Sequence, residues 1–143
     1  MTVHIRPATP ADAPALATLL TQLGYPSPAE DIPRRLATLD GEGNAAALVA
    51  ERNNRVVGLV TVNLHFTLAL ARPIAEVTSL VVAEEARVEG VGRRLADAAE
   101  AFARAQGCGR VYVTSAEHRA GAHAFYQHIG WAYTGRRFAK TIG

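Results

Sequence analysis

Hydrophobic positions along this chain alternate between the two-residue period of strands and the 3.6-residue period of helices. The run Val3 to Arg6 places Val3 and Ile5 on one face and predicts a short strand. Four leucines then repeat at helical spacing and predict a helix that ends at Gly24. They are Leu16, Leu19, Leu20 and Leu23, and the start of the helix is marked by Thr9, Pro10 and Asp12.

The next part of the chain combines one helical segment with two strand-forming runs. A second helix is predicted from Ser27 to Leu39, and Pro33 is an alternative start because proline suits a first helical turn. Two β-rich runs follow, Ala46 to Glu51 and Arg55 to Leu64. Asn53 and Asn54 between them tolerate positive φ and predict a tight hairpin turn.

The second half of the chain has the order strand, helix, strand, helix. The run Glu76 to Val82 ends in three apolar residues and predicts a central strand. The longest helical pattern spans Gly90 to Ala105, Arg110 to Ser115 alternates as a strand, and Ala120 to Ile129 is helical. Trp131 to Thr141 is predicted as a terminal β segment. This order is typical of an α/β protein with a mixed sheet.

Composition and charge narrow the classes of function. A chain of 143 residues that is 49% hydrophobic predicts a single domain over residues 1–143. The net charge of +2 is small and no block of like charges occurs, so no nucleic acid is expected as a partner. No apolar stretch approaches the roughly 18 residues of a membrane span, and we expect a cytoplasmic protein. The only cysteine, Cys108, is interpreted as structural, since no neighbouring motif would lower its pKa.

The stretch RVEGVGRRL, residues 87–95, joins the central strand to the longest helix. Its two glycines, Gly90 and Gly92, each cost about 1 kcal/mol relative to alanine at a helical position. A helix N-terminus exposes unpaired amides and the positive end of the helix dipole, and bare Cα positions let an anion approach them. Three arginines, Arg87, Arg93 and Arg94, add positive charge. The stretch therefore predicts a phosphate-binding loop, with an ordinary glycine-rich turn as the alternative.

Two other phosphate motifs do not fit this stretch. The dinucleotide fingerprint GxGxxG requires glycine where this chain has Leu95, and no Gly-Lys-Ser or Gly-Lys-Thr tripeptide of a P-loop occurs. The remaining pattern resembles the GNAT superfamily of acetyl-CoA-dependent N-acetyltransferases. Its signature (Q/R)xxGx(G/A) matches Arg87 to Gly92, and its second block AxxFYxxxGF is similar to AHAFYQHIGW, Ala122 to Trp131. The segments QLGYP, VNLHF and AEVTSLVV are similar to enzymes of the aminoalkylphosphonate N-acetyltransferase type.

The resemblance covers nearly the whole chain and implies a fold and a cofactor. The fold would be the acyl-CoA N-acyltransferase (GNAT) fold, a central mixed sheet of six to seven strands flanked by about four helices. The cofactor would be acetyl-CoA, with its pantetheine arm along one strand end and its pyrophosphate on the glycine-rich loop. The implied cofactor-binding residues are Leu80, Val81, Val82, Arg87, Val88, Glu89, Gly90, Val91, Gly92, Arg93 and Phe125.

The resemblance also implies transfer of the acetyl group to a primary amine by direct attack in a ternary complex. Glu76 is the candidate base, acting directly or through a water, because only the neutral amine is nucleophilic. Its alternative is a charge at a strand start paired with a surface arginine. Tyr126 is the candidate proton donor to the departing thiolate, with a core aromatic as the alternative. A Tyr126→Phe enzyme is expected to keep cofactor binding and to lose about 10²- to 10⁴-fold in turnover.

Several residues depart from the family's pattern. Val88 replaces a common glycine, and Glu89 places a negative charge beside the expected pyrophosphate. Thr78 and Ser79 stand where many relatives carry acids, which leaves Glu76 as the sole strand base. Ala116 stands where relatives often have an asparagine that contacts the cofactor.

The histidines do not predict a metal site. His123 and His128 are five residues apart and lie on different faces of the predicted helix, unlike an i, i+4 metal pair, and His118 precedes them. His65 on the second hairpin strand either lines the acceptor pocket or points to solvent. We therefore expect no metal.

The acceptor is left open by the sequence. A small-molecule amine is expected, and the alternatives are specifically an aminoalkylphosphonate, a protein N-terminus or a lysine. Three arginines, Arg34, Arg35 and Arg72, would receive an anionic acceptor or are simply solvated. Outside the enzymes, the alternative is an inactive acyl-CoA-binding regulatory domain. A homodimer paired through the terminal β segment would be ordinary for such a fold.

Overall fold

The computed structural model describes residues 2–114, 120–135 and 138–143. The chain divides into two compact units, residues 1–112 and residues 113–143. The first unit contains nearly all of a β-sheet and three helices, and the second contains one helix and the C-terminal segment. Each unit is described by itself below.

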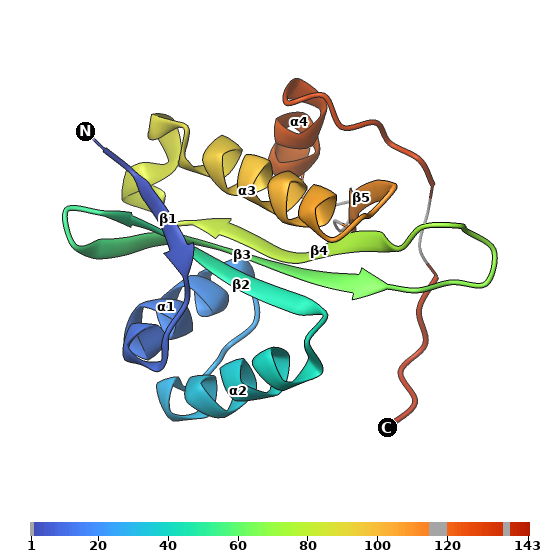
Figure 1. Cartoon of the computed structure of the whole chain (residues 1–143). Coiled ribbons are helices and arrows are strands. Elements are labelled where there is room, and N and C mark those ends of the chain that lie inside the picture. Colours follow the sequence, from blue (N-terminus) through green and yellow to red (C-terminus); the bar gives the residue numbers. More distant parts are fainter. Residues whose placement is uncertain (1, 115–119, 136–137) are drawn as a thin grey trace. The chain divides into compact units, whose positions relative to one another are not determined.

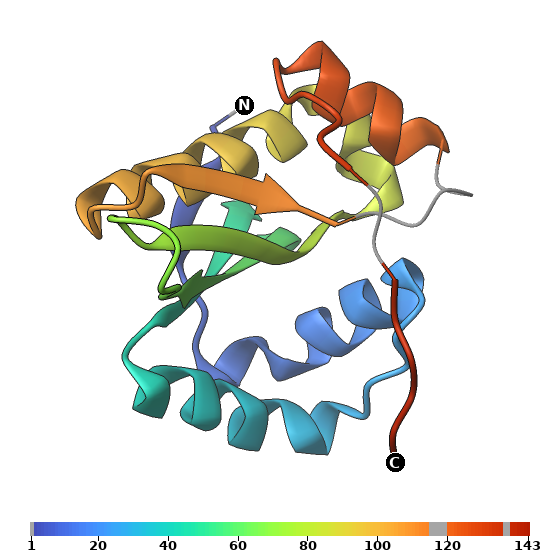
Figure 2. The same cartoon turned by 90° about the vertical axis from the view of Figure 1, so that its right-hand side faces the viewer.

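The sheet of the first unit has five strands in the order of the chain (Figure 1). Its first four strands pair antiparallel with their neighbours, whereas β4 and β5 run in the same direction, so the sheet is mixed (Figure 2). β5 starts beside the start of β4, where the Gly109 amide donates to the Pro73 carbonyl at 2.9 Å. The strands are β1 (His4–Pro7), β2 (Ala45–Arg52), β3 (Arg55–His65), β4 (Ile74–Val82) and β5 (Arg110–Val113).

Three α-helices and three short 3-10 helices complete the first unit. The α-helices are α1 (Ala13–Leu23), α2 (Ile32–Glu42) and α3 (Val91–Ala105). The 3-10 turns η1 (Pro10–Asp12), η2 (Ala29–Asp31) and η3 (Glu84–Glu89) precede α1, α2 and α3, respectively. The second unit contains α4 (Ala120–His128). No helix in the described ranges has the length and apolar character required to cross a bilayer.

Local sequence signals account for most boundaries of these elements. The Thr9 amide donates to the Asp12 carboxylate at 2.8 Å before α1, and Gly24 ends α1 with φ of 110°. Asn53 and Asn54 have φ of 52° and 63° in the turn between β2 and β3, which confirms the hairpin. These predictions are confirmed because each depends on residues only a few positions apart.

The two faces of the sheet can be distinguished from alternate residues of β3. A Cβ added at Gly58 would lie 2.8 Å from Leu95 Cδ1 and 3.2 Å from Val91 Cγ1, so α3 packs closely on this face. Leu59, the next residue along β3, faces α1 and α2, and so does Thr61, which lies two residues further along the strand. Figures 1 and 2 show this arrangement, with α1 and α2 on one side of the sheet and α3 on the other. We call these the α3 face and the α1/α2 face.

The mixed α/β class and four α-helices are confirmed, but the strand count and the terminal β segment are wrong. Five strands occur in the described part of the chain, not six or seven. Residues 131–135 and 138–141 are not in a strand, and Tyr133 and Phe138 are 64% and 93% exposed. Alternation gives a strand only when a neighbouring strand supplies hydrogen bonds and one face is buried, and this segment shows neither within its described residues.

Most predicted boundaries change by one or two residues, and those of the second helix and the last strand change for a visible reason. The second helix begins at Ile32 with Pro33 in its first turn, as the alternative start predicted. Ser27 does not cap a helix, because its hydroxyl donates to the Tyr25 carbonyl at 2.8 Å. It continues to Glu42, beyond the expected Leu39. The strand predicted over Arg110 to Ser115 ends at Val113, and Ser115 lies outside the described residues.

Candidate active site

A β-bulge in β4 determines which side chains face the α1/α2 side. Thr61 pairs with Ser79 and Val62 pairs with Val77, so Thr78 has no partner on β3. One extra residue reverses the alternation beyond it. As a result Thr78 and Ser79 both turn toward Thr61, whose hydroxyl lies 2.6 Å from the Thr78 hydroxyl and also bonds that of Ser79.

The bulge extends a row of polar side chains along this face. Asn63 and His65 share the face of Thr61 because they follow it at two-residue intervals on β3. Glu76 pairs directly with Asn63 and therefore points the same way. We call this set the polar row; it consists of Thr61, Asn63, His65, Glu76, Thr78 and Ser79.

Glu76 is held by two titratable partners from the neighbouring strands. His65 Nε2 lies 2.8 Å from Glu76 Oε1, and the Tyr112 hydroxyl of β5 hydrogen-bonds the same carboxylate. The rings of His65 and Tyr112 also approach each other, with centroids 6.5 Å apart. The side chains of His65 and Glu76 are 42% and 23% exposed, so the pair is accessible to a solute. Among residues 2–114, 120–135 and 138–143, no arginine pairs with Glu76, which was the alternative to a catalytic role.

Burial raises the pKa of the Tyr112 phenol, and the nearby Glu76 carboxylate raises it further through its charge and its hydrogen bond. The phenol therefore remains protonated through the neutral pH range and donates its hydrogen to Glu76. Among the described residues, the neighbours of the Glu76 carboxylate are thus an imidazole and a phenol.

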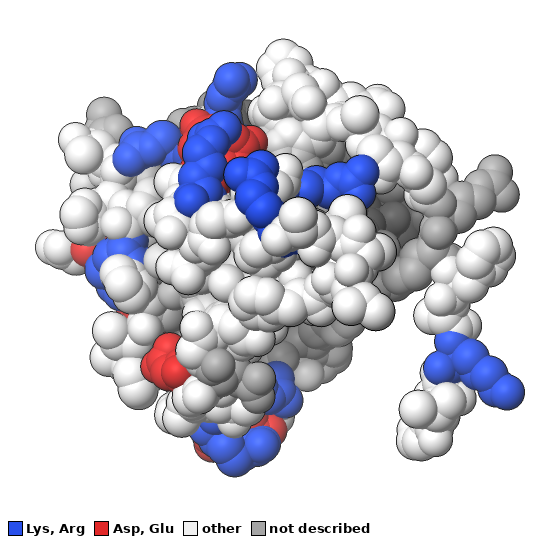
Figure 3. Space-filling model, turned by 45° about the vertical axis from the view of Figure 1, so that its right-hand side comes forward, with Lys and Arg blue, Asp and Glu red and all other residues white. Residues whose placement is uncertain are grey.

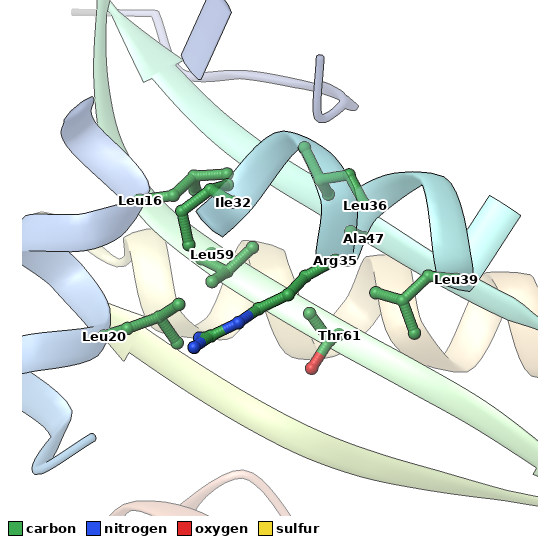
Figure 4. A pocket seen from close by; sticks show the side chains of 9 residues that line it. All are labelled: Leu16, Leu20, Ile32, Arg35, Leu36, Leu39, Ala47, Leu59 and Thr61. Carbon is green, nitrogen blue, oxygen red and sulfur yellow. The ribbon is translucent and has the colours of Figure 1, made fainter. Parts of the chain in front are cut away.

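A cavity of about 130 Å³ adjoins the polar row between α1, α2 and the sheet (Figure 4). Thr61 belongs to both the cavity wall and the polar row. Arg35 extends from α2 across the cavity between Leu20 and Thr61 (Figure 4). The lining residues are Leu16, Leu20, Ile32, Arg35, Leu36, Leu39, Ala47, Leu59 and Thr61. A small organic molecule could place an apolar part here and a polar group on the row.

The three candidate arginines for an anionic acceptor have different surroundings. Arg35 lines the cavity, donates to the Ser27 hydroxyl at 3.1 Å and lies 3.7 Å from Asp31. Arg34 is 72% exposed and also pairs with Asp31. Arg72 lies beside Gly109, 3.2 Å from where a Cβ would stand. Burial raises the pKa of the neighbouring Cys108 thiol against the opposing charge of Arg72, which agrees with a structural cysteine.

The glycine-rich loop has the geometry of an open helix N-terminus. Gly90 has φ of 74°, no atom would approach a Cβ placed there, and no side chain caps α3. The first helical hydrogen bond runs from Arg94 N to Gly90 O, so the amides of residues 91–93 precede it and lack helical acceptors. The positive φ is thus the reason for glycine at position 90, since an L-residue would be strained there.

The arginines around this loop are not equivalent. Arg94 reaches back to the Val3 carbonyl at 3.0 Å, which makes it structural rather than available to an anion. Arg87 and Arg93 are exposed beside the loop. The side chains of Val88 and Glu89 lie outside the described part of the structure, as does Ala116. On the face shown in Figure 3, several basic side chains gather in an upper group, and others lie at the left, at the bottom and at the lower right.

The strand end expected to hold the pantetheine arm is linked to α1. The Val82 carbonyl accepts from Gln22 Nε2 at 2.9 Å and from Arg87 Nε at 3.3 Å. β5 is only four residues long and accompanies the first half of β4, so no described strand borders Leu80 to Val82 on that side. The backbone edge at Leu80 and Val81 is therefore the part open to a ligand.

Tyr126 and Phe125 belong to α4 in the second unit. Their rings contact each other at a centroid distance of 5.3 Å, and Tyr126 also contacts Trp131 at 5.5 Å. α4 ends as predicted before Gly130, which has φ of 95°. Tyr126 belongs to the second unit and Glu76 to the first, and the placement of Tyr126 beside Glu76 stays a prediction.

Sequence reasoning did not identify Tyr112, Gln22 or the bulge at Thr78 as parts of the site. Tyr112 lay within a predicted strand, and its position next to Glu76 follows from the order of β4 and β5. The sequence left His65 either lining the acceptor pocket or pointing to solvent. In the structure its ring hydrogen-bonds Glu76 on the polar row. Among the described residues no group of three or more histidine, cysteine or acidic side chains is arranged to hold a metal, and His118 lies outside them.

The chain is similar to a known protein family and to several known proteins. A family model described as the acetyltransferase (GNAT) family matches residues 14–131. The chain is 33% identical over 94 residues to the aminoalkylphosphonate N-acetyltransferase of Salmonella typhimurium, a match that covers 66% of this chain and 61% of that protein. The chain thus matches less than two thirds of that relative's length.

Two further matches cover almost the whole chain. It is 33% identical over 138 residues to the aminoglycoside N(6')-acetyltransferase type 1 of Stenotrophomonas maltophilia, covering 92% of this chain and 88% of that protein. Among solved structures, an aminoglycoside N-acetyltransferase in complex with CoA superposes with a TM-score of 0.86 at 15% identity, covering 99% of this chain and 95% of the other. At that identity the likeness is one of fold.

Proposed function

Because the chain belongs to the GNAT family of acetyltransferases, we propose that it transfers the acetyl group of acetyl-CoA to a primary amine of a small molecule. The transfer would proceed by direct attack of the amine within a ternary complex. The observation that carries this proposal is the Glu76 carboxylate on the polar row beside the β4 bulge, which is accessible and has no arginine or lysine partner within the described part of the chain.

The residues around the glycine-rich loop fit the cofactor. A diphosphate suits the unpaired amides at the start of α3, and the left-handed Gly90 keeps the approach to them clear. Arg87 and Arg93 would add charge-assisted contacts. The open backbone edge at Leu80 and Val81 would accept the amide-containing pantetheine arm in the manner of an added strand. Acetyl-CoA supplies a thioester, an acyl group activated for attack by an amine.

Glu76 and Tyr126 would divide the proton transfers. An alkylammonium must lose a proton before its nitrogen can attack, and Glu76 is placed on the row that adjoins the cavity. Tyr126 would give a proton to the departing thiolate, a role that also requires α4 to lie beside the thioester. Phe125, its neighbour, would help to form the coenzyme site.

The acceptor is proposed to be a small molecule rather than a protein. The cavity of about 130 Å³ has the size for a small organic group and not for a peptide segment. The curated relatives named above act, by their names, on an aminoalkylphosphonate and on aminoglycosides. An anionic amine is the specific alternative, supported by Arg35 in the cavity wall. An inactive acyl-CoA-binding regulatory domain is the alternative that predicts no turnover.

The remaining expectations concern the whole molecule. We expect a single domain in the cytoplasm. The homodimer expected through the terminal β segment has no strand to support it within residues 131–135 and 138–141, and light scattering would decide it.

The proposed cofactor site can be tested with a matched pair of glycine substitutions. Gly90 and Gly107 lie at opposite ends of α3, have φ of 74° and 79°, and both have open space where a Cβ would stand. Gly90→Ala and Gly107→Ala should therefore introduce similar backbone strain, of about 1–2 kcal/mol. Only Gly90→Ala should weaken binding of coenzyme A, measured by calorimetry and by thermal protection. Equal binding by the two variants would contradict a site at this loop.

The proposed reaction is tested by thiol release from acetyl-CoA over a panel of aminophosphonates, aminoglycosides, polyamines and peptides. Turnover of a small amine is expected. Turnover of peptides alone would contradict the small-molecule acceptor. Binding of coenzyme A without turnover of any amine would favour the regulatory domain.

A further inference from the structure

Glu76 takes part in a hydrogen-bonded group that reaches across three strands, and this group contains a second proton acceptor. His65 comes from β3, Glu76 from β4 and Tyr112 from β5. Glu76 hydrogen-bonds His65, and the Tyr112 ring lies 6.5 Å from the His65 ring between centroids, whereas the Arg72 guanidinium of the preceding loop lies beside Gly109. On β5, the exposed Arg110 is two residues before Tyr112 and has no hydrogen bond or ion pair to Glu76 or His65 among the described residues. The group therefore carries one ionised carboxylate and no permanent cation.

The contact between His65 and Glu76 assigns different tasks to the two imidazole nitrogens. Nε2 lies 2.8 Å from Glu76 Oε1, and an ionised carboxylate accepts only, so Nε2 is the nitrogen that carries the hydrogen. Nδ1 is then the nitrogen with a lone pair. The side chain is 42% exposed, so water can reach the ring. A carboxylate that orients an imidazole in this way also stabilises the imidazolium once it forms.

We infer that the proton released by the acceptor ammonium is held on His65, with Glu76 as the group that orients the ring and balances its charge. This inference rests on the proposed function and assigns His65 a part in it. Of the three protons on the ammonium nitrogen, one stays on the amide product and one ends on the thiol of coenzyme A. The third reaches Nδ1 of His65, directly or through water near Glu76, and then leaves to solvent.

An imidazole is a better acceptor for the ammonium proton than a carboxylate alone. In water, carboxylic acids titrate near 4.3, imidazole near 6.5 and alkylammonium groups near 10.4, roughly. On these reference values an imidazole takes a proton from an ammonium with a smaller loss of free energy than a carboxylate does. The Tyr112 phenol occupies a further lone pair of Glu76 and keeps the carboxylate in place.

The test compares kcat/KM over pH 6 to 9.5 for the wild type and His65→Gln, with an amine that the wild type acetylates. Glutamine keeps a donor to Glu76 but cannot hold the proton. The variant should lose about 10²-fold at pH 7. The loss should shrink as the pH rises, because the neutral fraction of the amine grows about tenfold per unit below its pKa. His4→Gln, an exposed histidine on β1, is the matched control and should behave as the wild type.

A second variant separates proton transfer from structure. His65→Ala should be rescued by added imidazole, with kcat/KM rising with imidazole concentration, while the wild type should not respond. A His65→Gln enzyme with the wild-type pH profile, or a His65→Ala enzyme that imidazole does not rescue, would overturn the inference and leave Glu76 as the base by itself. A wild type that binds coenzyme A but acetylates no amine would instead contradict the proposed function, and this inference with it.

Discussion

Two carboxylate clusters on the same sheet have opposite character. Around Arg6 on β1, Asp12 contributes two oxygens at 2.9 Å and Glu51 contributes one at 2.9 Å. Around Glu76 on β4, the partners are the imidazole of His65 and the phenol of Tyr112. In the first cluster a permanent cation neutralises the carboxylates, and in the second the partners can themselves gain or lose a proton.

The difference separates a structural use of a carboxylate from a chemical one. Asp12 is 8% exposed, and the Arg6 guanidinium holds the pKa of its carboxyl below the ordinary value, against the opposing effect of burial. The same contacts raise the pKa of Arg6. The Asp12 carboxylate therefore keeps its charge, and the contacts of Arg6 connect η1 and β2 to β1. Glu76 has no arginine partner among the described residues, and its side chain is 23% exposed.

The largest expected effect is on turnover at the second cluster. Glu76→Gln keeps the size of the side chain and removes the anion that orients His65 and balances its charge. We expect a loss of about 10²- to 10⁴-fold in kcat with little change in the free energy of unfolding. Thiol release and urea unfolding measure the two quantities. Glu51→Gln is the matched control, and equal turnover losses in both variants would erase the contrast between the clusters.

The converse substitution in the first cluster should affect stability instead. Asp12→Ala removes the two oxygens that bind Arg6 and the acceptor for the Thr9 amide. We expect the free energy of unfolding to fall by about 1–3 kcal/mol, because part of a charged hydrogen-bond network is left unpaired. Turnover per folded molecule should stay unchanged. A loss of activity at full stability would mean that this cluster is not merely structural.

The pH dependence of stability should follow the first cluster. Because the pKa of Asp12 is lower in the folded state, its contribution is fully present above the unfolded pKa, near 4, and is lost as the pH falls through the lower folded value. The difference in unfolding free energy between wild type and Asp12→Asn should therefore shrink below about pH 4. Urea titrations from pH 3 to 7 measure it. A constant difference over that range would contradict the lowered pKa.

The smallest expected effect comes from Tyr112→Phe. This variant tests whether Tyr112 takes part in proton transfer in the second cluster or only contacts Glu76. The phenol donates to Glu76 but is not proposed to carry the proton, so we expect a loss in kcat/KM of less than about tenfold. Since the pKa of the phenol is raised, the ratio to wild type should be constant from pH 6 to 9. A ratio that changes with pH in that range would give Tyr112 a share in proton transfer.

Much of the fold could be predicted because its signals are local. Leucines at helical spacing gave α1, the Asn53–Asn54 pair gave the hairpin, and Gly24 and Gly130 gave helix ends with positive φ. The terminal β segment could not be predicted in this way. Its alternating residues become a strand only if another strand accepts them, and the described residues of the segment have no such partner.

The candidate site was predictable in part. The glycine-rich loop was proposed from a compact motif, and Glu76 was proposed from the resemblance to related enzymes. His65 and Tyr112 were not assigned to Glu76, since the three residues come from different strands. The bulge at Thr78 also escaped prediction, because the run from Glu76 to Val82 reads as a regular strand until its pairing with β3 is known.

The sequence by itself determined the order of helices and strands, the glycine-rich loop before α3 and the motifs by which the family is identified. Those features depend on backbone preferences and side-chain periodicity over short distances. Only the tertiary structure decided which polar side chains share a face and which of them surround Glu76. The reason is register: a shift of one residue between two strands moves a side chain to the opposite face, and the pattern within one strand does not specify it.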